Sequence, residues 1–559
     1  MGSAGGRSAA RRTHAGNMAR LLHAAPRGVA LTQDAAVLRP LESGSGLRQL
    51  LSKTKTFVRF VELANSRGPL TQKSRVLELA SELADSGEVH VLSLTDNAGG
   101  HPHLAPESLA NLLQGTDQEL LIHLSCKDHN RNGLVSRAWA LASAGLENIL
   151  ALSGDYPAAG YRGEGRPVFD LDSVSLLQML RQMNQGWTAP VAGKAFGWLA
   201  RPTRFFMGAV VSPYKRLESE LIPQYLKLER KIGSGAEFII TQTGFDSRKL
   251  DDLIRYLAHR QLEVPLIANV YLLNAPVTRY FHQGGVPGIV VTDRLLALAE
   301  QQSAAPDQGK VFFHELAARQ IAIARGLGCR GAYLAGSAKA EEVLQIFARA
   351  DALKDCWRDF AAEVQFGQEG EFYYFGPDAA TALSSSTPQL PRRAAGPLRH
   401  FAAPGFRFSR RVHRLLFERG SLGYRLGRAL YARVDRSPAT ARALHVLEQA
   451  IKIPLYGCRD CGDCSLAEIA YLCAESQCAK SQRNGPCGGS RNGRCESADR
   501  ECIWSRAYRR LKAVGLEHQL LQRPVVVTDA RLRGSSAWAN RFLERDHRAA
   551  QPKEPAAMG

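Results

Sequence analysis

The sequence lacks any hydrophobic run that could cross a membrane. The longest apolar runs, such as residues 205–211, are far shorter than the ~20 residues that a membrane-spanning helix needs. We therefore expect no membrane partner and a cytoplasmic protein.

Acidic residues are also scarce, because 53 Asp and Glu stand against 72 Lys and Arg, for a net charge of +19. Such an excess invites a nucleic-acid-binding function, but no motif of a known nucleic-acid-binding class accompanies it. Twelve arginines fall within residues 391–436, against only Glu418 and Asp435. A solvated basic face, or a docking surface for an acidic partner protein, explains this stretch as well as nucleic acid does. We therefore do not expect nucleic acid as a partner.

Three segments have the composition of chain ends or connections. Residues 1–50 begin with 33 residues that contain no acid, which is typical of a transit peptide or of a disordered basic tail, and we favour the tail. We expect a Ser-, Pro- and Ala-rich linker at 376–397 and a C-terminal tail at 526–559. The chain should then contain one domain at 51–375 and a basic, cysteine-rich domain at 398–525.

Short apolar runs alternate with helical stretches between about residues 55 and 345. Nearly continuous hydrophobic strands are typical of a parallel sheet covered by helices, and eight such units fit a barrel of ~250 residues. We predict an α/β fold, a (β/α)8 TIM barrel, followed by a small helical and loop-rich metal-binding domain. An open doubly wound sheet is the alternative, but no GxGxxG turn follows the first strand. The predicted strands are 57–63, 89–96, 120–126, 148–155, 205–212, 238–244, 265–273 and 331–336.

Eight of the eleven cysteines lie within residues 458–502. Three of them form a CxxCxxC run, whose thiolates can converge on one iron–sulfur cluster. A disulfide module would suit the even count, but no signal peptide precedes it. Zinc remains the alternative, although no later CxxC pair supplies the other half of a four-thiolate site. We predict a [4Fe–4S] cluster, with cysteines left over for a second metal. The predicted ligands are Cys458, Cys461, Cys464, Cys473, Cys478 and Cys487, and Cys495 and Cys502 are further candidates.

Polar residues stand at the ends of several predicted strands, where the active site of a barrel forms. Glu62 stands at the end of the first strand, Thr95 and Asp96 at the end of the second, His123 in the third, Asp155 at the end of the fourth and Gln242 at the end of the sixth. Each alone could be a strand-end residue that caps the next helix. Together they make an active-site constellation of carboxylates, imidazole, amide and hydroxyl.

Four blocks of this region resemble the methylenetetrahydrofolate reductase family of flavin-dependent TIM barrels. They are FVRFVEL with Glu62, LSLTDNAGG with Thr95, HLSCKDHNRNGLVSRAWALASAGLENILALSGDYP with His123 and Asp155, and KLERKIGSGAEFIITQTGFD with Gln242. The blocks occur in the family's order and cover about residues 55–345.

The resemblance implies reduction of 5,10-methylene-tetrahydrofolate to 5-methyl-tetrahydrofolate. Glu62 is then the general acid that opens the imidazolidine ring, Asp155 stabilises the resulting cation and contacts the flavin, and Gln242 binds the pterin. Residues expected to bind FAD or FMN are Thr95, His123, Ser153, Gly154, Asp155, Phe169, Lys215, Lys227, Arg230 and Lys231, the last four at its phosphate.

The chain departs from the simplest family members at four positions. Pro276 replaces an aromatic residue that helps to seat NADH, Ser153 replaces an arginine, Phe169 a tyrosine and Gln224 an acid. These changes leave FAD and FMN as alternatives, and they leave NAD(P)H or an acidic carrier such as ferredoxin as the electron donor.

The cysteine-rich segments CRDCGDCSLAEIAYLC, NGPCGGSRNGRCE and CIWSRAY resemble a partner subunit or C-terminal domain of some bacterial methylenetetrahydrofolate reductases, notably in acetogens. That domain is thought to carry iron–sulfur and to work in electron uptake, and here it would be fused to the barrel.

Two other functions compete with reduction. A barrel of the methyltransferase type would bind methyl-tetrahydrofolate without a flavin, and a cysteine-rich redox or nucleic-acid module could sit on a degenerate barrel. The oligomeric state, a homo-oligomer included, is left open.

Overall fold

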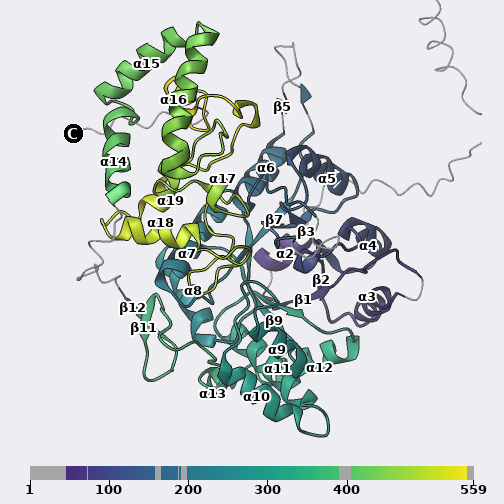
Figure 1. Ribbon diagram of the computed structural model, residues 1–559. Coiled ribbons are helices and arrows are strands. Elements are labelled where there is room, and N and C mark those ends of the chain that lie inside the picture. Colours follow the sequence, from purple (N-terminus) through teal and green to yellow (C-terminus); the bar gives the residue numbers. More distant parts are fainter. Residues whose placement is uncertain are drawn as a thin grey trace, which may run out of the picture. The chain divides into compact units, whose positions relative to one another are not determined.

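The described residues of the computed structural model are 46–53, 55–71, 74–157, 165–186, 188–189, 198–199, 201–389 and 404–549. Eight parallel strands close into a barrel in the order β1-β2-β3-β4-β7-β8-β9-β10, and β10 pairs back onto β1 (Figure 1). This confirms the predicted TIM barrel, and each predicted strand overlaps an observed one. The strands are β1 (Val58–Leu63), β2 (Val91–Leu94), β3 (Glu119–Ser125), β4 (Asn148–Leu152), β7 (Phe206–Val211), β8 (Phe238–Thr241), β9 (Leu266–Tyr271) and β10 (Gly331–Ala335).

Helices follow the strands and cover the barrel, because their apolar faces pack on strands that are buried on both sides. Short polar residues fix where several helices begin. Asp172, for example, accepts hydrogen bonds from the backbone N–H groups of Val174 and Ser175. The covering helices are α3 (Arg75–Asp85), α4 (Pro106–Leu113), α5 (Arg131–Ser143), α6 (Ser173–Gln185), α7 (Glu218–Gly233), α8 (Ser247–His259), α9 (Ala275–His282), α10 (Asp293–Ser303), α11 (Lys310–Gly326), α12 (Ala340–Ala352) and α13 (Trp357–Ala361), with the 3₁₀ turn η1 (Ala98–Gly100).

Helix α2 (Gly46–Lys53) closes the N-terminal end of the barrel. Its Leu47 and Leu51 join the buried interior cluster that contains Phe60 and Phe238. The backbone carbonyl groups of Leu50 and Leu51 accept hydrogen bonds from Arg330, the residue before β10. The C-terminal ends of the strands are therefore left to form the site.

Two short antiparallel hairpins complete this part of the chain, β5 (Thr188–Ala189) with β6 (Trp198–Leu199), and β11 (Phe375–Pro377) with β12 (Ser384–Pro388). The second hairpin lies within the predicted linker, so that the segment is structured up to Gln389. It is held to α8 because Asp252 accepts from the backbone N–H of Phe375 at 2.8 Å. The rest of the predicted linker, 390–397, lies outside the described residues.

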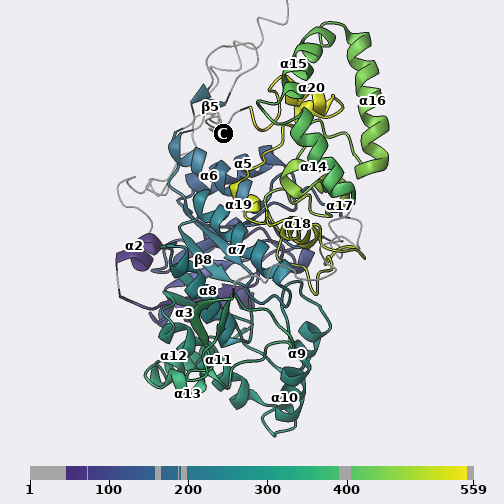
Figure 2. The ribbon, with the colours of Figure 1, turned by 90° about the vertical axis from the view of Figure 1, so that its left-hand side faces the viewer.

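The C-terminal region is helical and loop-rich, as predicted, and packs on α7 (Figures 1 and 2). Part of the predicted tail is folded, because Phe542 is buried against Tyr424 and Tyr431. Residues 1–45 of the predicted basic tail lie outside the described residues. No helix in the described ranges is long and apolar enough to cross a membrane. The elements are α14 (Pro404–Leu416), α15 (Leu422–Val434), α16 (Pro438–Tyr456), η4 (Ala467–Ile469), α17 (Ala474–Gln477), α18 (Ile503–Lys512), α19 (Gln519–Gln522), η5 (Ala530–Leu532) and α20 (Ala537–Phe542).

Candidate active site and cysteine sets

A cavity of about 620 Å³ lies at the C-terminal ends of the barrel strands. Every strand of the barrel contributes side chains or flanking residues to its wall, which is the usual place for the active site of this fold. Eight predicted site residues meet there: Glu62, Thr95, His123, Ser153, Gly154, Asp155, Lys231 and Gln242.

Glu62 belongs to a buried polar network. Its Oε2 accepts a hydrogen bond of 2.9 Å from the Tyr333 hydroxyl, which lies 3.5 Å from Nε2 of His123. The same His123 nitrogen lies 2.9 Å from Oγ of Ser93. Burial raises the pKa of Glu62, and the hydrogen bond from Tyr333 opposes this in part. Burial also lowers the pKa of His123 to about 4, so that its imidazole is neutral.

Asp155 and Gln242 are fixed by backbone groups. Oδ2 of Asp155 accepts from the N–H of Gly99 at 2.9 Å. Oε1 of Gln242 accepts from the N–H of Thr243 at 2.9 Å, which leaves the amide –NH₂ group for another partner. A carboxylate and an amide are therefore held in the cavity with spare hydrogen-bonding capacity.

The cavity also contains Asp96, which was expected at the end of a strand but was given no role. Asp96 accepts from both the N–H and the hydroxyl of Ser125 and pairs with Arg137 at 3.1 Å. Burial would raise the pKa of Asp96, but Arg137, Ser125 and the buried Lys127 together hold it below its usual value. Two residues of the cavity were not predicted: Lys127 directly follows a predicted strand, a signal that could have found it, whereas Tyr333 lies inside an apolar run and gives no such signal.

A loop of the C-terminal region roofs the cavity. Lys480, Cys487, Gly488, Gly489 and Glu496 line it from above. The roof is attached to the end of β4, because Nζ of Lys480 donates to the carbonyl of Gly154 at 2.8 Å and Ser153 Oγ donates to Gln482 Oε1 at 3.1 Å. The cysteine-rich region thus forms part of the barrel's site.

Three of the four cations predicted to hold a flavin phosphate instead bind this region. Lys215 donates to the carbonyls of Gly488 and Ser490, at 2.5 and 2.6 Å. Lys227 donates to Oε1 of Gln482 and to the carbonyl of Pro486, and Arg230 donates to that of Pro524. None of the three lines the central cavity, whose wall includes Lys231. Burial and the neighbouring Lys227 lower the pKa of Lys231 to about 7.

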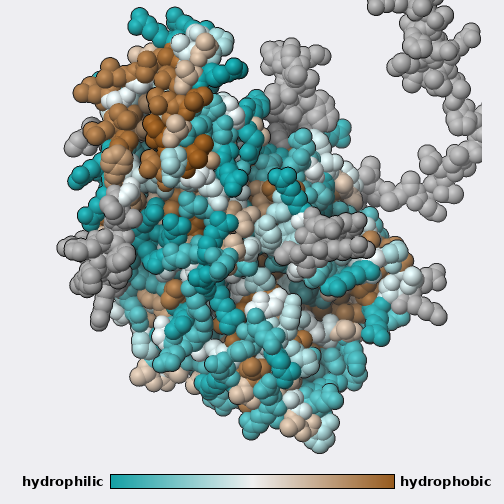
Figure 3. All heavy atoms as spheres, in the orientation of Figure 1, coloured by the Kyte–Doolittle hydropathy of each residue, from teal (hydrophilic) through white to brown (hydrophobic). Residues whose placement is uncertain are grey.

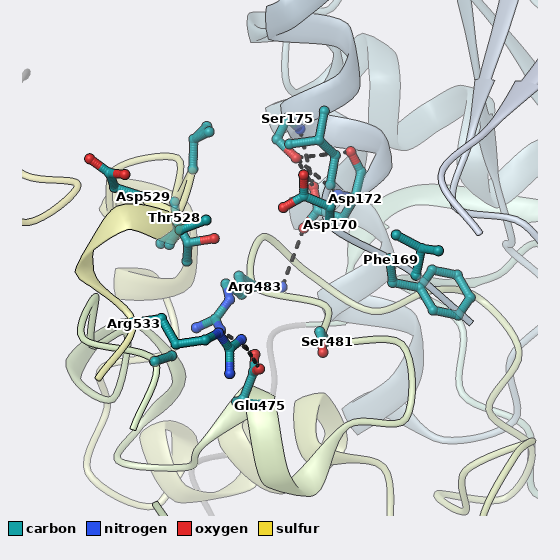
Figure 4. Close-up of a pocket in the computed structure, with 16 residues that line it drawn as sticks. Phe169, Asp170, Asp172, Ser175, Glu475, Ser481, Arg483, Thr528, Asp529 and Arg533 are labelled. Carbon is teal, nitrogen blue, oxygen red and sulfur yellow. Dashed lines mark hydrogen bonds and ion pairs between the residues drawn. The ribbon is translucent and has the colours of Figure 1, made fainter. Parts of the chain in front are cut away.

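A second pocket, of about 160 Å³, lies between the segment before α6 and the C-terminal region (Figure 4). Buried Asp172 accepts there from the N–H of Asn484 at 2.9 Å, besides capping α6. Phe169, predicted to contact the flavin, lines this pocket and not the central cavity. Its φ of 42° is in the left-handed region, and its ring stacks on Tyr156.

The eight clustered cysteines fall into two sets of four. The first cysteine set comprises Cys458, Cys461, Cys464 and Cys473, which line one small cavity. The second cysteine set comprises Cys478, Cys487, Cys495 and Cys502, whose thiols lie near enough to one another to affect each other's ionisation. Cys495 and Cys502 were candidates for a further ligand but were not placed among the six predicted ligands, because only the fold reveals which later cysteines share a set.

Cations and N–H groups surround both sets. Lys452 lies near Cys458 and Cys464, Arg483 near Cys461, and Lys480 near Cys487. Backbone N–H groups approach two sulfurs, from Asp460 to Cys458 at 3.4 Å and from Gln482 to Cys478 at 3.5 Å. Burial raises the pKa of several of these thiols, that of Cys502 to about 11, so that a thiolate needs compensation by positive charge. Across the described ranges, no three His, Cys, Asp or Glu side chains are arranged to hold a single metal ion.

Comparison with known proteins gives matches to two family models. Residues 47–283 match the model described as "Methylenetetrahydrofolate reductase", and residues 437–531 match "Methylene-tetrahydrofolate reductase C terminal". No curated protein matches the chain. A solved structure described as "Uncharacterized protein from Clostridium thermocellum binds two copies of 5-methyl-5,6,7,8-tetrahydrofolic acid" is 13% identical with a TM-score of 0.39, over 56% of this chain and 99% of that one. Residues 47–283 are thus similar to the methylenetetrahydrofolate reductase family, and the C-terminal domain that carries the same family name follows them on the same chain.

Proposed function

We propose that this protein reduces 5,10-methylene-tetrahydrofolate to 5-methyl-tetrahydrofolate. The observation that carries the proposal is Glu62, a buried carboxyl group with a raised pKa that shares one cavity with Asp155 and Gln242. Such a group stays protonated at higher pH than an exposed glutamate does, which suits a general acid. The match of residues 47–283 to the family model supports the substrate class.

The chain's own residues account for the proton and charge changes of the reaction. Tyr333 binds Oε2 of Glu62, so that Oε1 is the oxygen left to carry the acidic proton. Its transfer to N10 of the folate opens the five-membered ring and leaves a cation on the methylene–N5 unit. Asp155 supplies negative charge to that cation, and Gln242 offers paired donor and acceptor atoms to the pterin edge.

The cavity has features that fit a flavin, which when bound supplies the hydride to the methylene carbon. Thr95 Oγ1, Ser212 Oγ and Gln224 Nε2 are buried in its wall with no hydrogen-bond partner among the described residues. Buried polar atoms rarely lack a partner, so a ligand with polar edges suits them. Lys215 and Lys227 bind the roof and Arg230 binds the carbonyl of Pro524, so the cations in the cavity wall are the candidates to hold the phosphate, namely Lys127, Lys231 and Lys480. FMN and FAD both fit this arrangement.

The cysteine sets fit two iron–sulfur clusters. Each set offers four thiols, the number that a [4Fe–4S] cluster binds, and nearby cations and N–H groups suit the negative charge of the cluster. Zinc is the alternative, since each set also offers the four thiolates of a structural zinc site. The second set includes Cys487 in the cavity wall and could pass electrons into the cavity from the first.

The test is methyl-tetrahydrofolate formation by anaerobically purified protein, with a reduced viologen dye as donor. We expect flavin and iron–sulfur absorption in the visible spectrum and product formation by the wild type. Glu62→Gln keeps the shape but cannot donate the proton, so the rate should fall by ~10²–10⁴-fold at unchanged flavin content. Glu78→Gln on the outer helix α3 is the matched control and should be fully active. A colourless protein that passes the methyl group of methyl-tetrahydrofolate to a corrinoid would instead identify a methyltransferase.

A further inference from the structure

Helices α14, α15 and α16 present an exposed apolar surface (Figure 3). Leu422 and Leu426 on α15 are 76% and 72% exposed. Large exposed apolar patches are rare on soluble proteins, and they mark interaction sites. We call it the helical face, and its exposed large apolar residues are Phe408, Leu415, Leu416, Leu422, Leu426, Leu430, Val446, Leu447, Ile451, Ile453 and Leu455.

Arginines are interspersed with these apolar residues. Residues 404–451 contain ten arginines and no lysine, against three acids. Of the acids, Glu448 is buried against Lys452 and Asp435 pairs with Arg545. The helical face is therefore apolar and strongly positive. Helices α14 and α15 lie outside both family matches, whereas α16 lies within the second.

The charge of the helical face selects its occupant. A second copy of the same face would bring arginines against arginines, which costs free energy. The chain's own segments outside the described residues offer little acidic cover, because they contain four acids, Asp34, Glu42, Glu164 and Glu554, against the ten arginines of residues 404–451. Arginine without lysine is typical of protein interfaces, where the planar guanidinium binds carboxylates, whereas anionic membranes attract both residue types.

We propose that the helical face docks a small acidic electron-carrier protein, which passes electrons to the first cysteine set. Helix α16 ends at Tyr456, and after the capping Gly457 the chain enters Cys458, so that a protein bound along α16 lies beside this set. The inference rests on the proposed reductase function. Each carrier gives one electron, so two reduced carriers and two protons convert one 5,10-methylene-tetrahydrofolate into one 5-methyl-tetrahydrofolate.

Binding tests the surface independently of turnover. The full-length protein is immobilised and titrated with an acidic ferredoxin, and separately with a flavodoxin, at low and at physiological salt. Leu426→Glu and the double variant Arg425→Glu/Arg428→Glu should each raise the Kd of the carrier by about tenfold or more. The matched controls are Val311→Glu, at a 74% exposed valine of α11, and Arg75→Glu on α3, and both should leave the Kd unchanged.

Turnover separates a failed surface from a failed function. We expect the two helical-face variants to lose carrier-driven reduction while dye-driven reduction stays at the wild-type rate. If these variants bind the carrier as tightly as the wild type does, or turn over with it at the wild-type rate, the docking proposal alone is overturned. It is equally overturned if neither carrier binds the wild type, if Leu426→Glu converts a dimer to a monomer in light scattering, or if only anionic vesicles of phosphatidylglycerol bind. If the wild type shows no dye-driven reduction, the proposed function is overturned instead.

Discussion

Replacing Tyr333 by Phe removes one hydroxyl group and leaves the buried ring in place. That hydroxyl donates to Oε2 of Glu62 at 2.9 Å, and the bond stabilises the charged carboxylate. A hydrogen bond to a charged group contributes about 1.5–3 kcal/mol. Since one pKa unit corresponds to about 1.4 kcal/mol, its loss should raise the pKa of Glu62 by about 1–2 units.

The consequence is a shift in the pH profile. The general acid works only when protonated, so activity falls as the pH rises through the pKa of Glu62. In Tyr333→Phe this alkaline limb of kcat/KM, measured with the dye as donor, should move to higher pH by about 1–2 units. Tyr280→Phe removes a hydroxyl from the same cavity wall and should leave the limb in place. A limb that stays put or moves to lower pH in Tyr333→Phe would show that Glu62 is not the titrating acid.

Two further predictions follow from the site. Asp155→Asn removes a negative charge from the cavity and should raise the reduction potential of the bound flavin while slowing product formation; an unchanged potential in a redox titration would place Asp155 away from the flavin. Cys461→Ser should remove iron from the first cysteine set and abolish carrier-driven turnover, with dye-driven turnover retained. In iron analysis it should lose about four of about eight iron atoms per chain, whereas Cys356→Ser, outside both sets, should lose none. Loss of both activities in Cys461→Ser would mean that the set is structural support.

The barrel was predictable because its information is local in the sequence. A strand covered on both sides reads as a continuous apolar run, and the polar residue that ends it points to the mouth of the barrel. Glu62, Asp155 and Gln242 were found in this way, and they meet in one cavity. Asp172 and Asp246, which cap α6 and α8, also indicate in the sequence where those helices start.

The roof was not predictable because it depends on contacts between distant residues. Lys215 and Lys227 look like anion-binding cations until the loop some 260 residues later supplies their partners. The CxxCxxC spacing identifies three thiols of one set, but the nearness of Cys478 to Cys495 arises from tertiary structure. Tyr333 lies in an apolar run and Phe542 in a mostly polar stretch, and both acquire their roles only from what packs beside them.

Lys215, Lys227 and Arg230 are bound by carbonyl groups of the C-terminal domain, so that peptide and phosphate compete for one set of cations. Without that domain these cations would lose their carbonyl partners and would be free to bind a longer, doubly phosphorylated cofactor tail. If the proposed reductase uses FMN, the attachment of the domain and the shorter cofactor have one common cause. A barrel of this kind that lacks such a domain should then accept the longer flavin.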